Sequence, residues 1–151
     1  MKIRRVDGEL RRQIEHEANR TYGVSDFFSS YELIISGEGR VRATTPETLQ
    51  LASILKKVDS IGLYVAKYRK WGLTLSIEGS HYLCQQLKNT LELDRDDAVR
   101  WMMAAPVEAR QKTSGKFVVA RYHGFCMGTG VMGRDGRAYP QVPKWRRIPE
   151  E

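Results

Sequence analysis

The sequence predicts an α+β protein in two parts: an N-terminal α/β lobe with a mixed or antiparallel sheet over residues 1–88, and a C-terminal β pseudo-barrel over residues 89–151. Three observations support this. Helix and strand patterns alternate up to about residue 88. Three short strand patterns rich in Val and aromatic residues follow residue 114, separated by glycine turns. Positive charge is concentrated in the same C-terminal part. A chain of 151 residues has room for two small domains.

Capping residues and apolar spacing predict the elements of the N-terminal lobe. Asp7 caps a first helix that carries an apolar stripe at every fourth residue. Thr45 and Pro46 begin a second helix that closes on two lysines, and Ser76 begins a third. The expected elements are, in order, a helix over 8–21, a core plug at Phe27 and Phe28, a hairpin of strands 31–35 and 40–43, a helix from 46 to 57, strands over 60–68 and 73–75, and a helix that buries Leu83 and Leu87.

The C-terminal part reads as short strands joined by tight turns. His123-Gly124 separates strands over 116–122 and 125–132, and Asp135-Gly136 is a hairpin signal before a strand over 138–142. Pro140 places that last strand at an edge of the sheet, because proline cannot donate a ladder hydrogen bond. Small barrels need glycines where strands bend or backbones approach closely.

This order of residues resembles the PUA domain, an RNA-binding pseudo-barrel. A strand over 89–93 leads into an Asp94-capped helix, and the segments 115–122 and 128–131 resemble the central hairpin of that family. The variety most similar is the PUA-like tail of RNA cytosine-5 methyltransferases of the Sun/Fmu type, although Gly115-Lys116 stands where Gly-Asp is usual. An α/β lobe before such a domain resembles, in architecture alone, small ribosome-biogenesis and RNA-modification proteins. The resemblance implies RNA binding in rRNA processing, ribosome biogenesis or tRNA modification.

Charge supports a polyanionic partner independently of the resemblance. The net charge of the chain is +7, and residues 106–151 alone hold nine Lys or Arg against four acids, a net charge of +5. Domain-level asymmetry of this kind is the electrostatic footprint of nucleic-acid binding. Arg and Lys contact phosphates and aromatic rings stack on unpaired bases. The candidate RNA-binding residues are therefore Arg110, Lys112, Lys116, Arg121, Tyr122, Arg134, Arg137, Lys144, Trp145, Arg146 and Arg147.

Two details of this surface have alternative interpretations. Trp145 either packs on the barrel or stacks on a base. Arg40 and Arg42 alternate on one strand and either extend the basic surface or form a solvated strand face, which is the interpretation we favour.

Two patterns suggest other chemistry. Gly128-x-Gly130-x-x-Gly133 has the letters of a dinucleotide fingerprint, but a turn and Pro140 follow it where the fingerprint requires a helix, so we interpret the glycines as barrel positions. His81-x-x-Cys84 and His123-x-x-Cys126 supply ligand types for tetrahedral zinc. Zinc hooks normally use Cys-x-x-Cys, so we favour two small core cysteines and a turn histidine, and expect no metal or other cofactor.

The sequence therefore predicts a non-catalytic RNA-binding protein that acts on structured rRNA or tRNA. Neither cysteine has the Pro-Cys context of the methyltransferase nucleophile, and no methyl-donor domain is present. Alternatives are an RNA-binding arm of a separate RNA cytosine-5 methyltransferase and a protein-interaction module. Two cysteines without close pairing favour a reduced, cytoplasmic setting. No apolar run reaches the ~20 residues of a membrane span, and the first residues do not form a signal peptide. An RNA-modifying enzyme or a ribosome-assembly factor is the expected protein partner.

Overall fold

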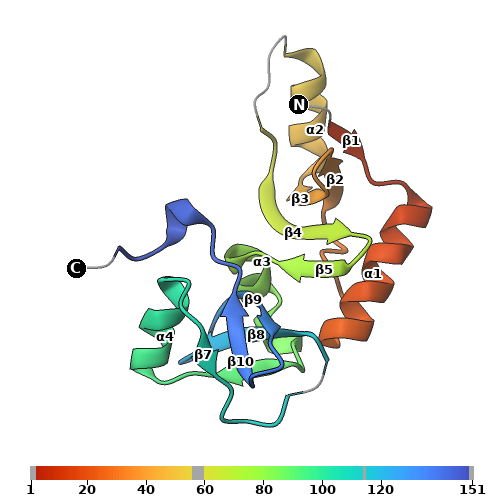
Figure 1. The fold of residues 1–151 in the computed structure, drawn as a ribbon. Helices are drawn as coiled ribbons and strands as arrows, with labels where there is room; N and C mark the ends of the chain where they lie inside the picture. The colour runs from red at the N-terminus through yellow and green to blue at the C-terminus, as the bar shows by residue number, and fades with distance from the viewer. Residues whose placement is uncertain (1–2, 56–59, 114, 150–151) are drawn as a thin grey trace.

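The fold consists of two five-stranded sheets with helices packed beside them (Figure 1). The computed structural model describes residues 3–55, 60–113 and 115–149. Its strand orders are β1-β2-β3-β4-β5 in the first sheet and β6-β8-β9-β10-β7 in the second, which curls as a half-barrel. The predicted α+β class is confirmed. The division into domains at residue 88 stays a prediction.

The first sheet is antiparallel throughout. It contains β1 (Ile3–Arg5), β2 (Glu32–Ser36), β3 (Arg40–Thr44), β4 (Leu63–Arg69) and β5 (Gly72–Leu75). The predicted hairpin of β2 and β3 is confirmed. β4 begins at Leu63 rather than at residue 60, because Gly62 has a φ of 74° and interrupts the extended backbone. β1 was not predicted, because three residues are too few to show an alternation.

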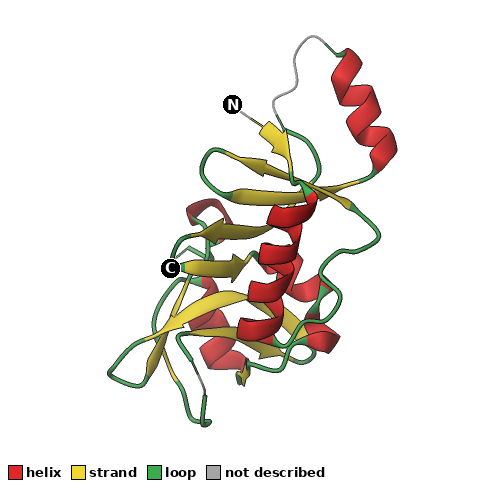
Figure 2. Cartoon of the chain, turned by 90° about the vertical axis from the view of Figure 1, so that its right-hand side faces the viewer, coloured by secondary structure: helices red, strands yellow, loops and turns green. Residues whose placement is uncertain are grey.

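Two helices belong to this sheet, and both begin where capping residues predict. α1 (Gly8–Tyr22) begins at Asp7, whose carboxylate accepts a 2.8 Å hydrogen bond from the Leu10 N–H, and ends at Gly23 with φ 72°. It lies across the strands in Figure 2. α2 (Pro46–Ile54) begins at Thr45 and lies at the far end of the molecule from the second sheet (Figure 1). Its predicted closing lysines, residues 56 and 57, lie outside the described residues.

The third helix is shorter than the sequence predicted. α3 (Ile77–Tyr82) begins at the predicted cap, where the Ser76 hydroxyl accepts a 2.9 Å hydrogen bond from Gly79 N–H, and a 3₁₀ turn, η1 (Cys84–Gln86), follows it. Gly79 lies so close to β4 that a Cβ there would stand 2.0 Å from the Val65 carbonyl oxygen. The predicted burial of Leu83 and Leu87 is confirmed.

The second sheet contains one parallel pair and three antiparallel pairs. β6 (Thr90–Glu92) runs parallel to β8 (Phe117–Tyr122), which pairs antiparallel with β9 (Phe125–Met132); β10 (Arg137–Pro140) lies between β9 and β7 (Val107–Glu108). The predicted edge position of the Pro140 strand is therefore wrong. β7 pairs only with Arg137 and Ala138, so Pro140 lies beyond the end of β7 and removes no hydrogen bond from that pair.

α4 (Arg95–Met102) covers the second sheet and explains its glycines. Asp94 caps the helix as predicted, accepting a 2.8 Å hydrogen bond from Asp97 N–H. Trp101 is completely buried, and a Cβ on Gly130 would stand 2.3 Å from its ring. Gly128 and Gly130 lie within β9, and no helix begins there, so the strand interpretation of the glycine motif is confirmed and the dinucleotide alternative is excluded.

The two sheets share one hydrophobic core. Phe117, Val119 and Cys126 of the second sheet pack with the buried residues of the first. The same core contains Phe27 and Phe28 from the loop between α1 and β2, whose predicted core position is confirmed. A second cluster lies under α4 around Trp101. Because the first core spans both sheets, burial fixes the orientation of one sheet against the other.

Cys84 and Cys126 form a disulfide between η1 and β9. Both cysteines lie in the core, as predicted. The prediction that they are not paired was wrong, because packing of α3 against β9 brings the two Cα atoms to 5.7 Å although the residues are 42 apart in sequence. The inference of a reduced compartment loses its basis. The sulfurs are bonded to each other, so neither is a thiolate that could bind zinc, and the His81 ring stacks on Phe125 with centroids 5.1 Å apart.

Candidate nucleic-acid interface

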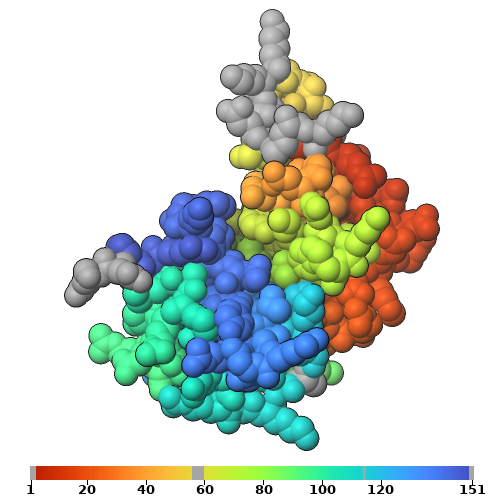
Figure 3. Space-filling model, in the orientation of Figure 1, coloured from red at the N-terminus to blue at the C-terminus, as the bar shows by residue number. Residues whose placement is uncertain are grey.

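The basic C-terminal segment folds back towards α3 and the end of α4. A single 3₁₀ turn, η2 (Lys144–Arg146), follows Pro143, and Ile148 N–H donates a 2.9 Å hydrogen bond to the Met102 carbonyl at the end of α4. Trp145 is 72% exposed, so the barrel-packing alternative is wrong. Figure 3 shows this segment in blue beside the orange and yellow-green surface of β3 and β4.

A cleft separates η2 from β3 and β4. Its volume is about 280 Å³. We call it the junction cleft and define it by the residues that give it charge and aromatic character: Arg40, Arg42, Tyr64, Glu78, Trp145 and Arg146. The first three lie on the first sheet, Glu78 on α3, and the last two on η2. Three guanidinium groups and one carboxylate make the junction cleft basic.

Aromatic and ionic contacts hold the arginines of the cleft. The guanidinium carbons of Arg40 and Arg42 lie 5.7 and 5.9 Å from the centre of the Tyr64 ring. Arg42 Nη1 donates to the Gly62 carbonyl at 3.5 Å, while its buried Nε has no hydrogen-bond partner among the described residues. Arg146 forms an ion pair with Glu78. Burial raises the pKa of the Tyr64 hydroxyl, and the two arginines oppose that shift. The Tyr64 hydroxyl therefore stays protonated beside the two arginines.

Arg40 and Arg42 were interpreted as a solvated strand face, and the structure does not support that interpretation. Both side chains are half-buried, and both line the junction cleft. Their part in RNA binding stays a prediction. Tyr64 was missed entirely, because nothing in the sequence shows that β4 places its ring beside both arginines.

The remaining predicted residues do not form one basic surface. Arg110 forms a 3.5 Å ion pair with Asp94, and a hollow beside it is lined by both signs of charge: Asp94, Asp96, Asp97, Glu108, Arg100, Arg110 and Arg137. Arg121 pairs with Glu92. Lys116 lies over the Phe117 ring at 5.4 Å, and Tyr122 is half-buried beside His123. Lys112 and Arg134 are exposed without a described ion-pair partner.

Arg147 and Lys144 flank the cleft rather than line it. Arg147 Nε donates a 3.0 Å hydrogen bond to the Val142 carbonyl, which turns this side chain towards the barrel, and Lys144 is exposed. Of the eleven candidates, the structure thus brings Trp145 and Arg146 into the junction cleft and Arg110 and Arg137 into the hollow of mixed charge, and it places the other seven in neither. The charge asymmetry of the sequence could not show how many of the cations are paired with acids.

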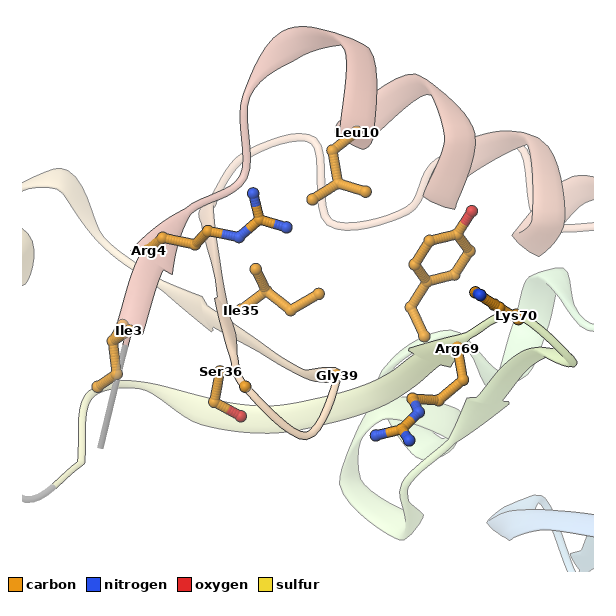
Figure 4. A pocket seen from close by; sticks show the side chains of 10 residues that line it. Ile3, Arg4, Leu10, Ile35, Ser36, Gly39, Arg69 and Lys70 are labelled. Carbon is orange, nitrogen blue, oxygen red and sulfur yellow. The ribbon is translucent and has the colours of Figure 1, made fainter.

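A second hollow lies on the first sheet, between α1 and the β2–β3 turn (Figure 4). Its volume is about 710 Å³. Leu10, Ile35 and Tyr68 form apolar parts of its wall, and Arg4, Arg69 and Lys70 supply its cations (Figure 4). Arg69 is already held by a 2.9 Å hydrogen bond to the Glu38 carbonyl. This hollow is lined by the first sheet, its turns and α1, whereas the junction cleft joins both parts of the chain.

The fold of the chain is that of a PUA domain. The structure is similar to the crystal structure of a PUA domain from Aeropyrum pernix K1, determined as a tartrate complex, with a TM-score of 0.56 and 16% sequence identity. The match covers 91% of this chain and 74% of that one, so it extends over both sheets. The predicted PUA fold is confirmed. No protein-family model and no curated protein matches the sequence. Within the described residues, no helix is long and apolar enough to span a membrane.

Proposed function

We propose that the protein is a non-catalytic RNA-binding protein. The observation that carries the proposal is Trp145, an indole 72% exposed between Lys144 and Arg146, which lines a basic cleft of a PUA-like fold. Exposed aromatic rings flanked by cations stack on unpaired bases, while the cations contact the phosphates. Large aromatic side chains are otherwise mostly buried in proteins.

Further parts of this proposal concern the RNA and the setting. The RNA is a structured rRNA or tRNA, and the protein acts in RNA modification or ribosome biogenesis, together with an RNA-modifying enzyme or an assembly factor. Resemblance to the Sun/Fmu-type tail supports an RNA-modifying enzyme as partner. The lobe that precedes the barrel supports an assembly factor. Crosslinking in cells, followed by sequencing of the bound RNA and identification of bound proteins, tests these parts. Enrichment of unstructured messenger RNA alone would contradict them.

Salt dependence of RNA binding tests the central part. Log affinity falls linearly with log salt concentration, because binding releases counterions from the RNA. Each phosphate that the protein neutralises makes this slope steeper by roughly 0.7–0.9. We expect purified protein to bind structured rRNA or tRNA fragments with a slope that corresponds to several phosphates. The same measurement on Arg147→Ala shows what a cation of the same segment contributes when it lies outside the cleft. RNA affinity that is absent, or that does not change between low and physiological salt, would refute the proposed function.

A further inference from the structure

The size and position of the junction cleft limit what it can hold. About 280 Å³ is near the lower end of the ~300–1,000 Å³ range of small-molecule sites, which suits one nucleotide and not a duplex. Both parts of the chain build its walls, with β3 and β4 on one side and η2 on the other. A ligand in the cleft therefore contacts the first sheet and the C-terminal segment together.

The η2 side offers a platform for a base. The indole of Trp145 lines the cleft and is 72% exposed. Its backbone is held in place, because Arg146 N–H donates to the Pro143 carbonyl at 2.9 Å and Ile148 N–H to the Met102 carbonyl at 2.9 Å. A ring on a fixed backbone loses little conformational freedom when a base stacks on it.

The β3 side offers phosphate ligands. Arg40 and Arg42 are two residues apart on one strand, so their side chains leave the same face of the sheet. The Tyr64 ring lies beside both guanidinium groups, and the Nε of Arg42 has no acceptor among the described residues. Arg40 Nε lies 3.4 Å from a carboxylate oxygen of Glu38, an exposed ion pair with which a phosphate on Arg40 competes. Planar guanidinium groups bind phosphate oxygens in pairs of hydrogen bonds. The two arginines therefore suit the phosphates on either side of one nucleotide.

Glu78 opposes an anionic ligand in this site. Its carboxylate lines the cleft and forms the ion pair with Arg146. An RNA phosphate entering the cleft is repelled by this carboxylate and competes with it for Arg146. Removal of the carboxylate charge therefore strengthens RNA binding, whereas a purely structural ion pair predicts the opposite or no change.

We propose that the junction cleft binds one unpaired nucleotide of the RNA, with its base on Trp145 and its flanking phosphates on Arg40 and Arg42. This inference rests on the proposed function and gives the N-terminal lobe a direct part in RNA binding. It also restricts the cleft to bulged, looped or terminal nucleotides, because a paired base is not free to stack on a protein ring.

Two RNA probes separate this inference from general RNA binding: a fully paired hairpin stem, and the same stem with one bulged uridine. Affinities are measured by fluorescence anisotropy at fixed salt. We expect Trp145→Ala to weaken binding of the bulged RNA about tenfold and to leave the paired stem unchanged, and Trp145→Phe to retain most of the affinity. Thermal melting checks that the variants are folded. We expect unchanged melting because the Trp145 ring is exposed and contributes little to the core.

Charge variants complete the test. The double variant Arg40→Ala with Arg42→Ala should weaken binding of the bulged RNA. It should also flatten the slope of log affinity against log salt by about two phosphate contacts. Glu78→Gln should strengthen binding several-fold. Arg12→Ala, an exposed cation on α1 outside the cleft and not among the candidate RNA-binding residues, is the control and should have at most one contact's effect on either RNA. The contrary outcome is that the wild type binds RNA while Trp145→Ala and the Arg40/Arg42 double variant bind the bulged RNA as tightly as the wild type does. In that case the inference is wrong and the proposed function stands. An equal loss on both RNAs also overturns it.

Discussion

The hydroxyl oxygens of Tyr22 and Thr129 lie 2.9 Å apart at a completely buried position between the two sheets. Tyr22 Oη also lies 2.6 Å from the Leu73 carbonyl oxygen, and Thr129 Oγ1 accepts a 2.8 Å hydrogen bond from Leu75 N–H. A carbonyl oxygen can only accept, so the single Tyr22 proton is donated to Leu73 and the Thr129 hydroxyl donates to Tyr22. Every polar atom of this junction is satisfied, and burial raises the pKa of the Tyr22 hydroxyl.

Replacement of Thr129 by Val is expected to destabilise the protein by about 2–3 kcal/mol. The side chain keeps its shape, but Tyr22 Oη loses a donor and Leu75 N–H loses its acceptor inside the core. The free energy of unfolding, measured by urea denaturation, tests this. Thr129→Ser, which keeps the hydroxyl, is the matched control. A Val variant as stable as the Ser variant would show that the hydroxyl contributes nothing to the junction.

Local signals in the sequence predicted most of the fold. Asp7, Thr45, Ser76 and Asp94 cap the helices that they were expected to cap, because a capping bond needs only the next three residues. The His123-Gly124 turn is likewise confirmed, with both residues at positive φ.

Long-range relationships were not predictable. The Cys84–Cys126 disulfide and the Tyr22–Thr129 bond join residues that only the packing of one sheet against the other brings together. The junction cleft shows the same limit. The sequence indicated Trp145 and Arg146, but the position of Tyr64 opposite them depends on how η2 folds back towards α3.

Gly130→Ala is expected to destabilise the protein by about 1–3 kcal/mol. The added Cβ would stand 2.3 Å from a ring carbon of Trp101, which is buried and hydrogen-bonded to the Met127 carbonyl at 2.9 Å and so has little room to move. Denaturant unfolding measures the change. Gly37→Ala is the control, since its Cβ would meet nothing within 4 Å. Equal effects of the two substitutions would contradict the contact.

Asp135 is expected to titrate at lower pH than an ordinary aspartate. The Tyr139 hydroxyl and the Arg137 N–H donate to its carboxylate and lower its pKa. Because the pKa of Asp135 is lower in the folded than in the unfolded protein, the ionised carboxylate stabilises the turn at every pH above the unfolded-state pKa. This contribution is lost as the pH falls through the folded-state pKa, so it disappears in acid below about pH 4. Carboxyl-carbon NMR measures the midpoint. Tyr139→Phe should raise it, and an unchanged midpoint would exclude the hydroxyl as the cause.

Loss of the Cys84–Cys126 disulfide is expected to lower the free energy of unfolding by about 4 kcal/mol. The bond closes a loop between residues 42 apart, and the chain entropy that it removes from the unfolded state grows with the logarithm of that length. Thiol titration of the denatured protein should find no free thiol before reduction. Cys84→Ser with Cys126→Ala, compared with the oxidised protein in urea unfolding, gives the size of the effect. Dithiothreitol should bring the wild type to the stability of that variant, and should leave the variant unchanged. Wild-type protein that unfolds at the same urea concentration with and without complete reduction would show that packing of α3 on β9, and not the covalent bond, holds the two sheets together.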